Sequence, residues 1–454
     1  MKINHNVTAQ IANVNLKKDE RRVSSSLEKL SSGYKITKAA DDSAGLAISN
    51  KMRNQIRALN QASRNSEDGQ SIVQTADGAL NEVAAILQRI RELTVQNAND
   101  TYTVDDRAAS QNEIDQLLDE IDRISSTTEF NGKGLLDGSS ARLITSSVDG
   151  IQALKTSLEV PSGDYMFSID TAPQPAVAED VEFTIPGILY INNTVIEFSS
   201  EDTEETASDK ILDLCNKMDI DVEFSGTSCT LTTKAAGDNQ HITIKHASGE
   251  PEQLFMGSDA QITLGDGFSE NAKITANGSH VTIRDTSGFE MLIEIPAETP
   301  EGSPEGQEVT LKVYDAGYMG IQIGANENQM LHMNFDEVSC NTLSLRDFNG
   351  QRLINVCSNH SAEMAISSID VAIERVSATR SELGAYQNRL EDTTSSLDVA
   401  AYNMTNSMSR IIDTDMADEM TQYTQLNVLT QAATTMLSQA NSKPQEIMNL
   451  LQGM

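Results

Sequence analysis

The sequence predicts an α+β fold, with a long α-helical bundle or coiled-coil core formed by both chain termini and a β-rich acidic inserted outer domain. Three observations support this prediction. Apolar residues recur at helical spacing near both ends, short β-rich runs broken by Gly, Pro, Asn and Asp occupy the middle, and most of the negative charge lies in that middle part. Matching helical patterns on either side of an insert favour packing of the two ends against each other.

The N-terminal region begins with an apolar stripe at helical spacing. The stripe starts at Ile3, Val7 and Ile11, and Gly33 marks the expected end of this helix. Pro161 is the first proline of the chain, so no proline interrupts a helix before it.

Two further stripes follow in the same region. The second helix is expected to begin near Asp41, Asp42 and Ser43, which supply N-cap chemistry. Its stripe comprises Ile72, Ala76, Leu80, Val83, Leu87 and Ile90. The stripe of the third helix comprises Ile114, Leu117, Leu118, Ile121 and Ile124.

The C-terminal region shows the clearest periodicity. Apolar residues recur at intervals of seven without interruption at Ile369, Val376, Leu383, Leu390, Leu397, Met404 and Ile411. The companion heptad position is less apolar and includes Arg380, Gln387 and Thr394. A helix that shares its stripe with several neighbours in a bundle therefore fits better than a two-stranded coiled coil.

The last segment carries another apolar stripe. We expect its helix to end before Ser442, which forms a predicted capping box with Gln445 for a short final helix that contains Pro444. Chain ends fray unless a partner holds them, so we expect both ends to be mobile in the monomer and ordered in a polymer. The predicted self-assembly residues are Ile3, Val7, Ile11, Leu429, Met436 and Leu450.

The charge is unevenly distributed along the chain. Residues 171–340 contain 7 basic and 30 acidic residues, whereas residues 1–170 contain 19 and 24 and residues 341–454 contain 7 and 13. Such a surface gains nothing from counterion release or from attraction to anionic lipid, which argues against nucleic acid and membrane as partners. Within the β-rich part, a helix is expected near residues 205–218, and the Asn-Gly pair at 277–278 predicts a hairpin.

The motifs do not indicate an enzyme. The six histidines include no His-Glu-x-x-His pair, and the chain contains neither GxxxxGK[ST] nor GxSxG. His241 and His246 lie five apart on a strand-like run, so we expect surface residues on opposite faces and not metal ligands. Cys215 and Cys229 are expected to be small buried apolar residues. We expect no catalytic residue, no metal and no cofactor.

The sequence also argues against a cleaved secretory signal and a membrane-spanning helix. The N-terminal sequence MKINHNVTAQIANVNLKK has no continuous apolar stretch, which argues against a cleaved secretory signal. No window approaches the roughly 20 apolar residues that a membrane-spanning helix needs.

Several long motifs resemble those of bacterial flagellin. The stretch SSGYKITKAADDSAGLAISNKMRNQIRALNQ resembles the N-terminal core of that family, and AIERVSATRSELGAYQNRLEDT and LSQANSKPQEIMNLL resemble its C-terminal core. The resemblance covers about residues 1–140 and 318–454. It implies a structural subunit that polymerises into the flagellar filament for motility. It also implies secretion into the extracellular filament without a cleaved signal peptide, with a flagellar export chaperone, the flagellar secretion apparatus and the filament cap as partners.

The resemblance also implies a division of the chain into domains. Residues 1–45 and 415–454 would pair as helices that line the filament channel. Residues 46–140 and 318–414 would form the long-helix core, with a β-hairpin near residues 320–345. Residues 141–317 would be the surface-exposed acidic insert, which we expect assembly not to require.

One helix face carries a predicted recognition site. Arg89 and Leu93 lie four residues apart, and an antiparallel neighbouring helix would bring Glu113 alongside them. In flagellins with this motif the matching residues contact the flagellin-sensing Toll-like receptor of vertebrates, so the resemblance implies a receptor-binding role for Arg89, Leu93 and Glu113. The competing interpretation is core packing for Leu93 and a solvated ion pair for the other two.

Two alternative functions remain open at this point. A hook–filament junction protein has similar chain ends, and the acidic insert could serve as an adhesin or as a passive spacer. The number of copies per flagellum would distinguish a filament subunit from a junction protein, because a filament contains many copies of its subunit and a junction only a few. A glycan or host-cell binding assay would separate the second.

Overall fold

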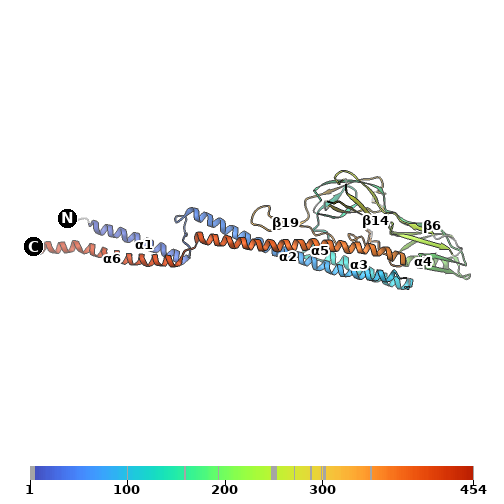
Figure 1. Ribbon diagram of the computed structural model, residues 1–454, viewed down its shortest axis with the longest axis horizontal. Coiled ribbons are helices and arrows are strands. Elements are labelled where there is room, and N and C mark those ends of the chain that lie inside the picture. The colour runs from blue at the N-terminus through green and yellow to red at the C-terminus, as the bar shows by residue number, and fades with distance from the viewer. Residues whose placement is uncertain are drawn as a thin grey trace. The chain divides into compact units, whose positions relative to one another are not determined.

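The computed structural model describes residues 6–99, 101–157, 160–192, 194–226, 228–246, 253–269, 271–286, 289–297, 299, 303–347 and 350–452, and the side chains of these up to residue 446. The helices in this part of the chain are Val7–Ser32 (α1), Ser43–Asn97 (α2), Val104–Thr127 (α3), Glu204–Lys217 (α4), Asn359–Ile412 (α5) and Met416–Gln452 (α6). Long helices near both ends and strands between them confirm the predicted α+β fold (Figure 1).

The strands occupy the middle of the chain. Their bounds are Glu129–Phe130 (β1), Lys133–Gly134 (β2), Ile144–Ser146 (β3), Gln152–Thr156 (β4), Gly163–Thr171 (β5), Pro175–Glu182 (β6), Gly187–Ile191 (β7), Thr194–Phe198 (β8), Ile220–Ser225 (β9), Ser228–Ala236 (β10), His241–His246 (β11), Gln253–Met256 (β12), Gln261–Leu264 (β13), Lys273–Asn277 (β14), His280–Arg284 (β15), Glu290–Glu294 (β16), Glu308–Val313 (β17), Met319–Gln322 (β18) and Met330–Met333 (β19). The predicted Asn277–Gly278 hairpin joins β14 to β15, and Gly278 has the positive φ of 62° that this turn requires.

The chain divides into two compact units. One comprises Met1–Ser66, Gln322–Gln329 and Asp392–Met454, and contains the paired helices α1 and α6. The other comprises Glu67–Ile321 and Met330–Glu391, and contains α3, α4 and most strands. Helices α2 and α5 contribute residues to both units.

Local chemistry sets the helix ends where the sequence predicts them. Helix α1 stops at Gly33, which adopts a left-handed conformation (φ 76°) and donates its backbone N–H to the carbonyl of Lys29. Helix α2 starts after Asp42, whose Oδ1 accepts hydrogen bonds from the backbone N–H groups of Ala44 (3.0 Å) and Gly45 (2.9 Å).

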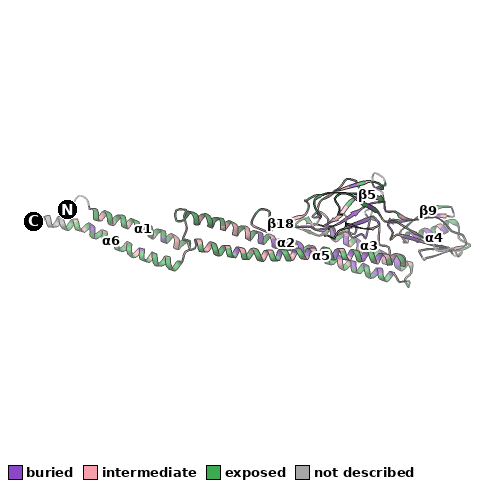
Figure 2. Ribbon diagram, turned by 45° about the horizontal axis from the view of Figure 1, so that its top comes forward, coloured by how far each residue is buried: buried purple, intermediate pink, exposed green. Residues whose placement is uncertain are grey.

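The helical core of the second unit forms from the predicted stripes. All six stripe residues of α2 are buried, and so are Ile114, Leu118 and Ile121 of α3. In Figure 2 the buried residues gather on α2, α3 and α5 beside the strands. The first four heptad residues of α5, from Ile369 to Leu390, are buried, whereas the last three are half-buried. The heptad therefore has several neighbours in the second unit, which is the bundle arrangement that its polar companion position favours.

Two pairs of sheets enclose the β-rich cores. The sheets β13-β5-β17-β3 and β14-β15-β16-β4 share one apolar core, in which Phe167, Ile283 and Leu311 are buried. The sheets β6-β10-β9 and β12-β11-β7-β8 share a second core with α4, which contributes Ile211 and Cys215. Cys215 and Cys229 are buried there as free thiols, which confirms their expected packing role, and burial raises the pKa of Cys229 to about 11.

The predicted break before Ser442 is wrong. Helix α6 continues through Pro444 to Gln452. A proline lacks the N–H that would bond to the carbonyl four residues earlier, here that of Ala440. Asn6 replaces this missing donor, because its Nδ2 donates to the Ala440 carbonyl oxygen at 2.9 Å. The sequence pattern could not show this compensation, since the donor comes from the opposite end of the chain.

The expectation that His241 is a surface residue is also wrong. Its relative exposure is 6%, and its ring lies edge-on to that of His360, with 4.2 Å between the ring centroids. The start of α5 covers this face of β11. Periodicity assigns a residue to a face of a strand but does not reveal which element covers that face.

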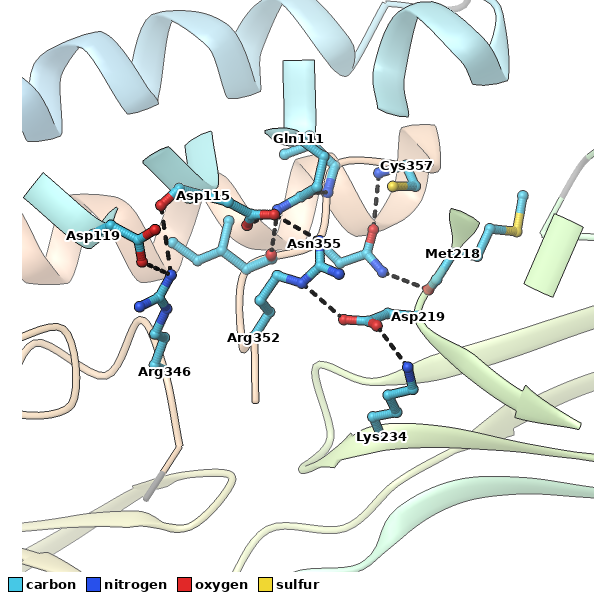
Figure 3. A network of polar contacts seen from close by, with 12 residues as sticks. Gln111, Asp115, Asp119, Met218, Asp219, Lys234, Arg346, Arg352, Asn355 and Cys357 are labelled. Carbon is cyan, nitrogen blue, oxygen red and sulfur yellow. Dashed lines mark hydrogen bonds and ion pairs between the residues drawn. The ribbon is translucent and has the colours of Figure 1, made fainter. Parts of the chain in front are cut away.

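A polar network fixes the segment between β19 and α5 (Figure 3). Arg352 pairs with Asp115 of α3 through Nη1 (3.0 Å) and with Asp219 through Nε (3.0 Å). Asn355 donates its Nδ2 to the carbonyl of Met218 at 2.7 Å. The segment therefore connects α3 to the sheet that contains β9 and β10.

Among the helices of the described residues, none has the length and apolar character that a membrane span requires.

We predict that the Arg352→Ala substitution destabilises the second unit by about 1–3 kcal/mol, because it leaves two partly buried carboxylates without their shared partner. Urea unfolding followed by circular dichroism measures the change. Arg123→Ala is the matched control, because Arg123 pairs with Glu120 at 2.6 Å but its side chain is 58% exposed. Equal shifts of the unfolding midpoint in both variants would contradict a structural role for the network.

Candidate functional site

Helices α1 and α6 form an antiparallel pair. Ser26 donates its hydroxyl to Oε1 of Glu419 at 2.5 Å, and the backbone N–H of Thr414 donates to the carbonyl of Gly33 at 2.9 Å. At the other end of the pair, Asn6 bonds to Ala440 as described above. The predicted partner of the C-terminal stripe is thus partly the N-terminal helix of the same chain.

The seam between these two helices is lined mainly by small and polar residues. The less exposed positions recur at steps of three and four, as in a coiled coil. The positions that follow these steps are Ala9, Ala12, Leu16, Asp19, Val23, Ser26 and Leu30 on α1, and Glu419, Tyr423, Leu426, Thr430, Ala433, Leu437 and Ala440 on α6. Most of these positions are only half-buried, so each contributes less to the stability of the pair than a fully buried side chain would.

A second set of apolar residues lies outside this seam. Ile11 of α1 is 57% exposed and Met436 of α6 is 66% exposed. The other large apolar residues exposed on the two helices are Val7, Val14, Leu27, Met416, Met420, Val428 and Leu429. We call these nine residues the outer apolar rows. Exposed apolar area of this extent on a weakly packed helix pair is typical of a surface that binds a partner.

The predicted self-assembly residues fall into two groups. Val7, Ile11, Leu429 and Met436 belong to the outer apolar rows. The other two predicted residues lie outside the described part: Ile3 entirely, and Leu450 with respect to its side chain. The role of all six in assembly stays a prediction.

The predicted recognition residues meet on neighbouring helices of the second unit. Arg89 of α2 donates from Nη2 (2.9 Å) and Nε (3.2 Å) to Oε1 of Glu113 on α3, and both side chains are about half exposed. Glu92 also pairs with Arg89, through Oε2 at 3.3 Å from Nη1. These hydrogen bonds, that to Glu113 foremost, hold the pKa of Arg89 above its ordinary value. An antiparallel α3 thus brings Glu113 beside Arg89.

Leu93 lies beneath this ion pair. Its relative exposure is 3%, so in this conformation it packs in the helical core and offers almost no surface to a partner. Of the three predicted recognition residues, only Arg89 and Glu113 are accessible. The i, i+4 spacing places Leu93 one helical turn from Arg89, but it does not distinguish an exposed neighbour from a buried one.

Sequence reasoning missed several polar contacts. Glu92 was not assigned to the recognition surface, although its position three residues after Arg89 is the spacing of a helical ion pair. The Ser26–Glu419 and His241–His360 contacts had no local signal, since the members of each pair are far apart in the sequence. Within the described residues, no group of three or more His, Cys, Asp or Glu side chains is arranged to hold a metal ion.

Comparison with known proteins identifies the family to which both helical ends of the chain are similar. A family model described as the bacterial flagellin N-terminal helical region matches residues 3–141, and one described as the bacterial flagellin C-terminal helical region matches residues 366–451. The chain is 35% identical to the flagellin of Clostridium tyrobutyricum over 445 residues, which cover 98% of this chain and 100% of that relative. It is 32% identical to the flagellin of Bacillus subtilis over 454 residues, which cover 99% and 100%.

Solved structures give weaker likenesses. FliC from Burkholderia pseudomallei is 17% identical with a TM-score of 0.24, covering 71% of this chain and 99% of that chain. A TM-score this low carries no argument, so the assignment rests on the sequence matches. These matches span both helical ends and nearly the full length of named relatives. The chain therefore belongs to the bacterial flagellin family, a family of structural filament proteins and not of enzymes.

Proposed function

We propose that this chain is the repeating subunit of a bacterial flagellar filament and that the outer apolar rows of α1 and α6 form its subunit contacts. The observation that carries this proposal is an antiparallel helix pair whose seam is mostly half-buried and whose outer faces expose apolar residues such as Ile11 and Met436. Each large apolar side chain contributes about 1.5–3 kcal/mol when it becomes fully buried. Packing against neighbouring copies would thus supply the apolar burial that the isolated pair lacks.

Other parts of the proposal follow from family membership. The chain would leave the cell through the flagellar secretion apparatus without a cleaved signal peptide. An export chaperone would bind it before export, and the filament cap would guide its assembly outside the cell. Relatives that are named flagellin favour a filament subunit over a hook–filament junction protein.

The acidic middle of the chain would face solvent in the filament. Its 30 acidic and 7 basic residues over 171–340 repel the same region of a neighbouring copy, which disfavours a position inside the filament wall. We propose residues 141–317 as this outer domain.

We also propose that the monomer binds the flagellin-sensing Toll-like receptor of vertebrates through the α2–α3 surface. Arg89 and Glu113 supply accessible charge there, and a partly exposed arginine is a frequent hot-spot residue. Leu93 would support this surface from below through packing. In the filament, this face would be covered by neighbouring subunits.

We predict that Ile11→Asp and Met436→Asp each raise the critical concentration for filament formation roughly tenfold or more, because a charge would replace a buried apolar contact. Seeded polymerisation, followed by sedimentation and electron microscopy, measures the effect. Both side chains are exposed in the monomer, so monomer circular dichroism should not change. Ile11→Leu and Met436→Leu are matched controls and should polymerise normally. Wild-type assembly by both Asp variants would refute the contact surface.

We predict that Arg89→Ala and Glu113→Ala each weaken receptor binding of the monomer by about fivefold or more. Surface plasmon resonance with immobilised receptor ectodomain measures the affinity. Arg123→Ala is the control, because it removes an exposed arginine from α3 that pairs with Glu120 instead. Unchanged affinity of the Arg89→Ala, Glu113→Ala double variant would exclude this surface.

We predict that Leu93→Ala lowers the stability of the second unit. Because Leu93 is 3% exposed, its truncation leaves a cavity and should cost about 2–5 kcal/mol of unfolding free energy. Arg89→Ala should leave the urea midpoint nearly unchanged, since that side chain is half exposed. A Leu93→Ala variant as stable as wild type would show that the leucine does not pack as described.

A further inference from the structure

A polar cavity lies between the outer face of the β12-β11-β7-β8 sheet and the first turn of α5. Its volume is about 480 Å³, and it lies within the second unit. Thr243 and His241 of β11 and Leu254 of β12 line it on the sheet side, and His360 and Glu363 line it on the helix side. Two imidazoles and one carboxylate thus reach the same cavity from segments that are far apart in the sequence.

The two histidine rings are close enough to share an ion. Their centroids are 4.2 Å apart and their planes meet at 74°. Imidazole nitrogens bind zinc at about 2.0–2.1 Å, which at a tetrahedral angle places the ring centroids of two ligands on one ion about 5 Å apart. The rings would therefore have to separate by about 1 Å. The side chain of His360 is 58% exposed, so it is free to make this movement.

His241 is prepared as a ligand. Burial, with the neighbouring His360 as the second cause, lowers its pKa to about 4, so its ring is neutral at neutral pH. A neutral imidazole carries one proton, so one of its two ring nitrogens keeps a lone pair that can bind a metal ion.

Glu363 is the nearest source of a third ligand. It lies one helical turn after His360, and its Oε2 is 4.0 Å from Nδ1 of His360. Its side chain is 66% exposed, so a rotation of its exposed side chain can bring the carboxylate toward the ring pair. The three groups are not already arranged around one point, in line with the absence of a preformed ligand group in the described residues.

We propose that His241 and His360 bind a divalent transition-metal ion of the Zn²⁺ class and recruit Glu363 as the third ligand. Nitrogen ligands favour Zn²⁺, Ni²⁺ and Cu²⁺ over Mg²⁺ and Ca²⁺, which prefer oxygen ligands. The bound ion connects the sheet to the start of α5. It therefore stabilises the second unit by mass action, because the unfolded chain does not hold the two histidines together.

The experiment uses the full-length chain without a histidine tag, stripped with EDTA and titrated with ZnCl₂ at pH 7.5 in a calorimeter. We expect one ion per chain and a rise in the melting temperature with added Zn²⁺, but no rise with Mg²⁺. His241→Ala and His360→Ala should each weaken binding by about tenfold or more, and Glu363→Gln should weaken it less.

Two features keep this test decisive. His360→Ala removes an exposed side chain, so its loss of binding cannot be attributed to unfolding if circular dichroism is unchanged. His246→Ala is the matched control, because His246 lies on the same strand but on the opposite face. The proposal is overturned if wild type does not bind Zn²⁺, or if the His360→Ala variant binds it as tightly as the His246→Ala variant.

Discussion

Burial of one apolar stripe along α2 is the constraint on which the second unit depends. The stripe from Ile72 to Ile90 is closed by α3 and α5, whose own apolar residues are buried with it. Once α3 packs here, Glu113 meets Arg89 on the surface, and Asp115 becomes available to Arg352. The exposed Arg89–Glu113 pair and the structural network around Arg352 thus both depend on the packing of α3.

The polar network and the core around α4 both include residues of the segment just before α5. The core around α4 includes Cys357, which belongs to the segment just before α5 and lies outside the predicted insert 141–317. Arg352 and Asn355 of the same segment hold Asp219 and Met218. A chain shortened by removal of the whole insert would expose Cys357 and leave these polar groups to solvent. The contacts of a short segment of the helical part therefore constrain the residues around α4 and β9.

The features predicted correctly from the sequence are those with local causes. Gly33 ends α1 because its own backbone conformation requires glycine, and the Asn277–Gly278 turn joins two strands that are adjacent in the chain. Apolar periodicity also identified the buried residues of α2 and of the first part of α5, from Ile369 to Leu390. The candidate sites were less predictable, because exposure depends on distant elements. Leu93 is covered by packing and His241 by α5, and neither spacing nor residue type reveals such cover.

The bond from Asn6 to the Ala440 carbonyl also has a consequence for alignment. A seam that repeats similar residues at steps of three and four discriminates weakly between neighbouring alignments of two helices, whereas one polar residue with a single partner selects one of them. Asn6 bonds to the carbonyl whose helical donor Pro444 lacks. Together with the Ser26–Glu419 bond, it prevents α1 from sliding along α6 by a turn. Every copy of the chain would then present its outer apolar rows with the same longitudinal offset, which a regular helical lattice requires.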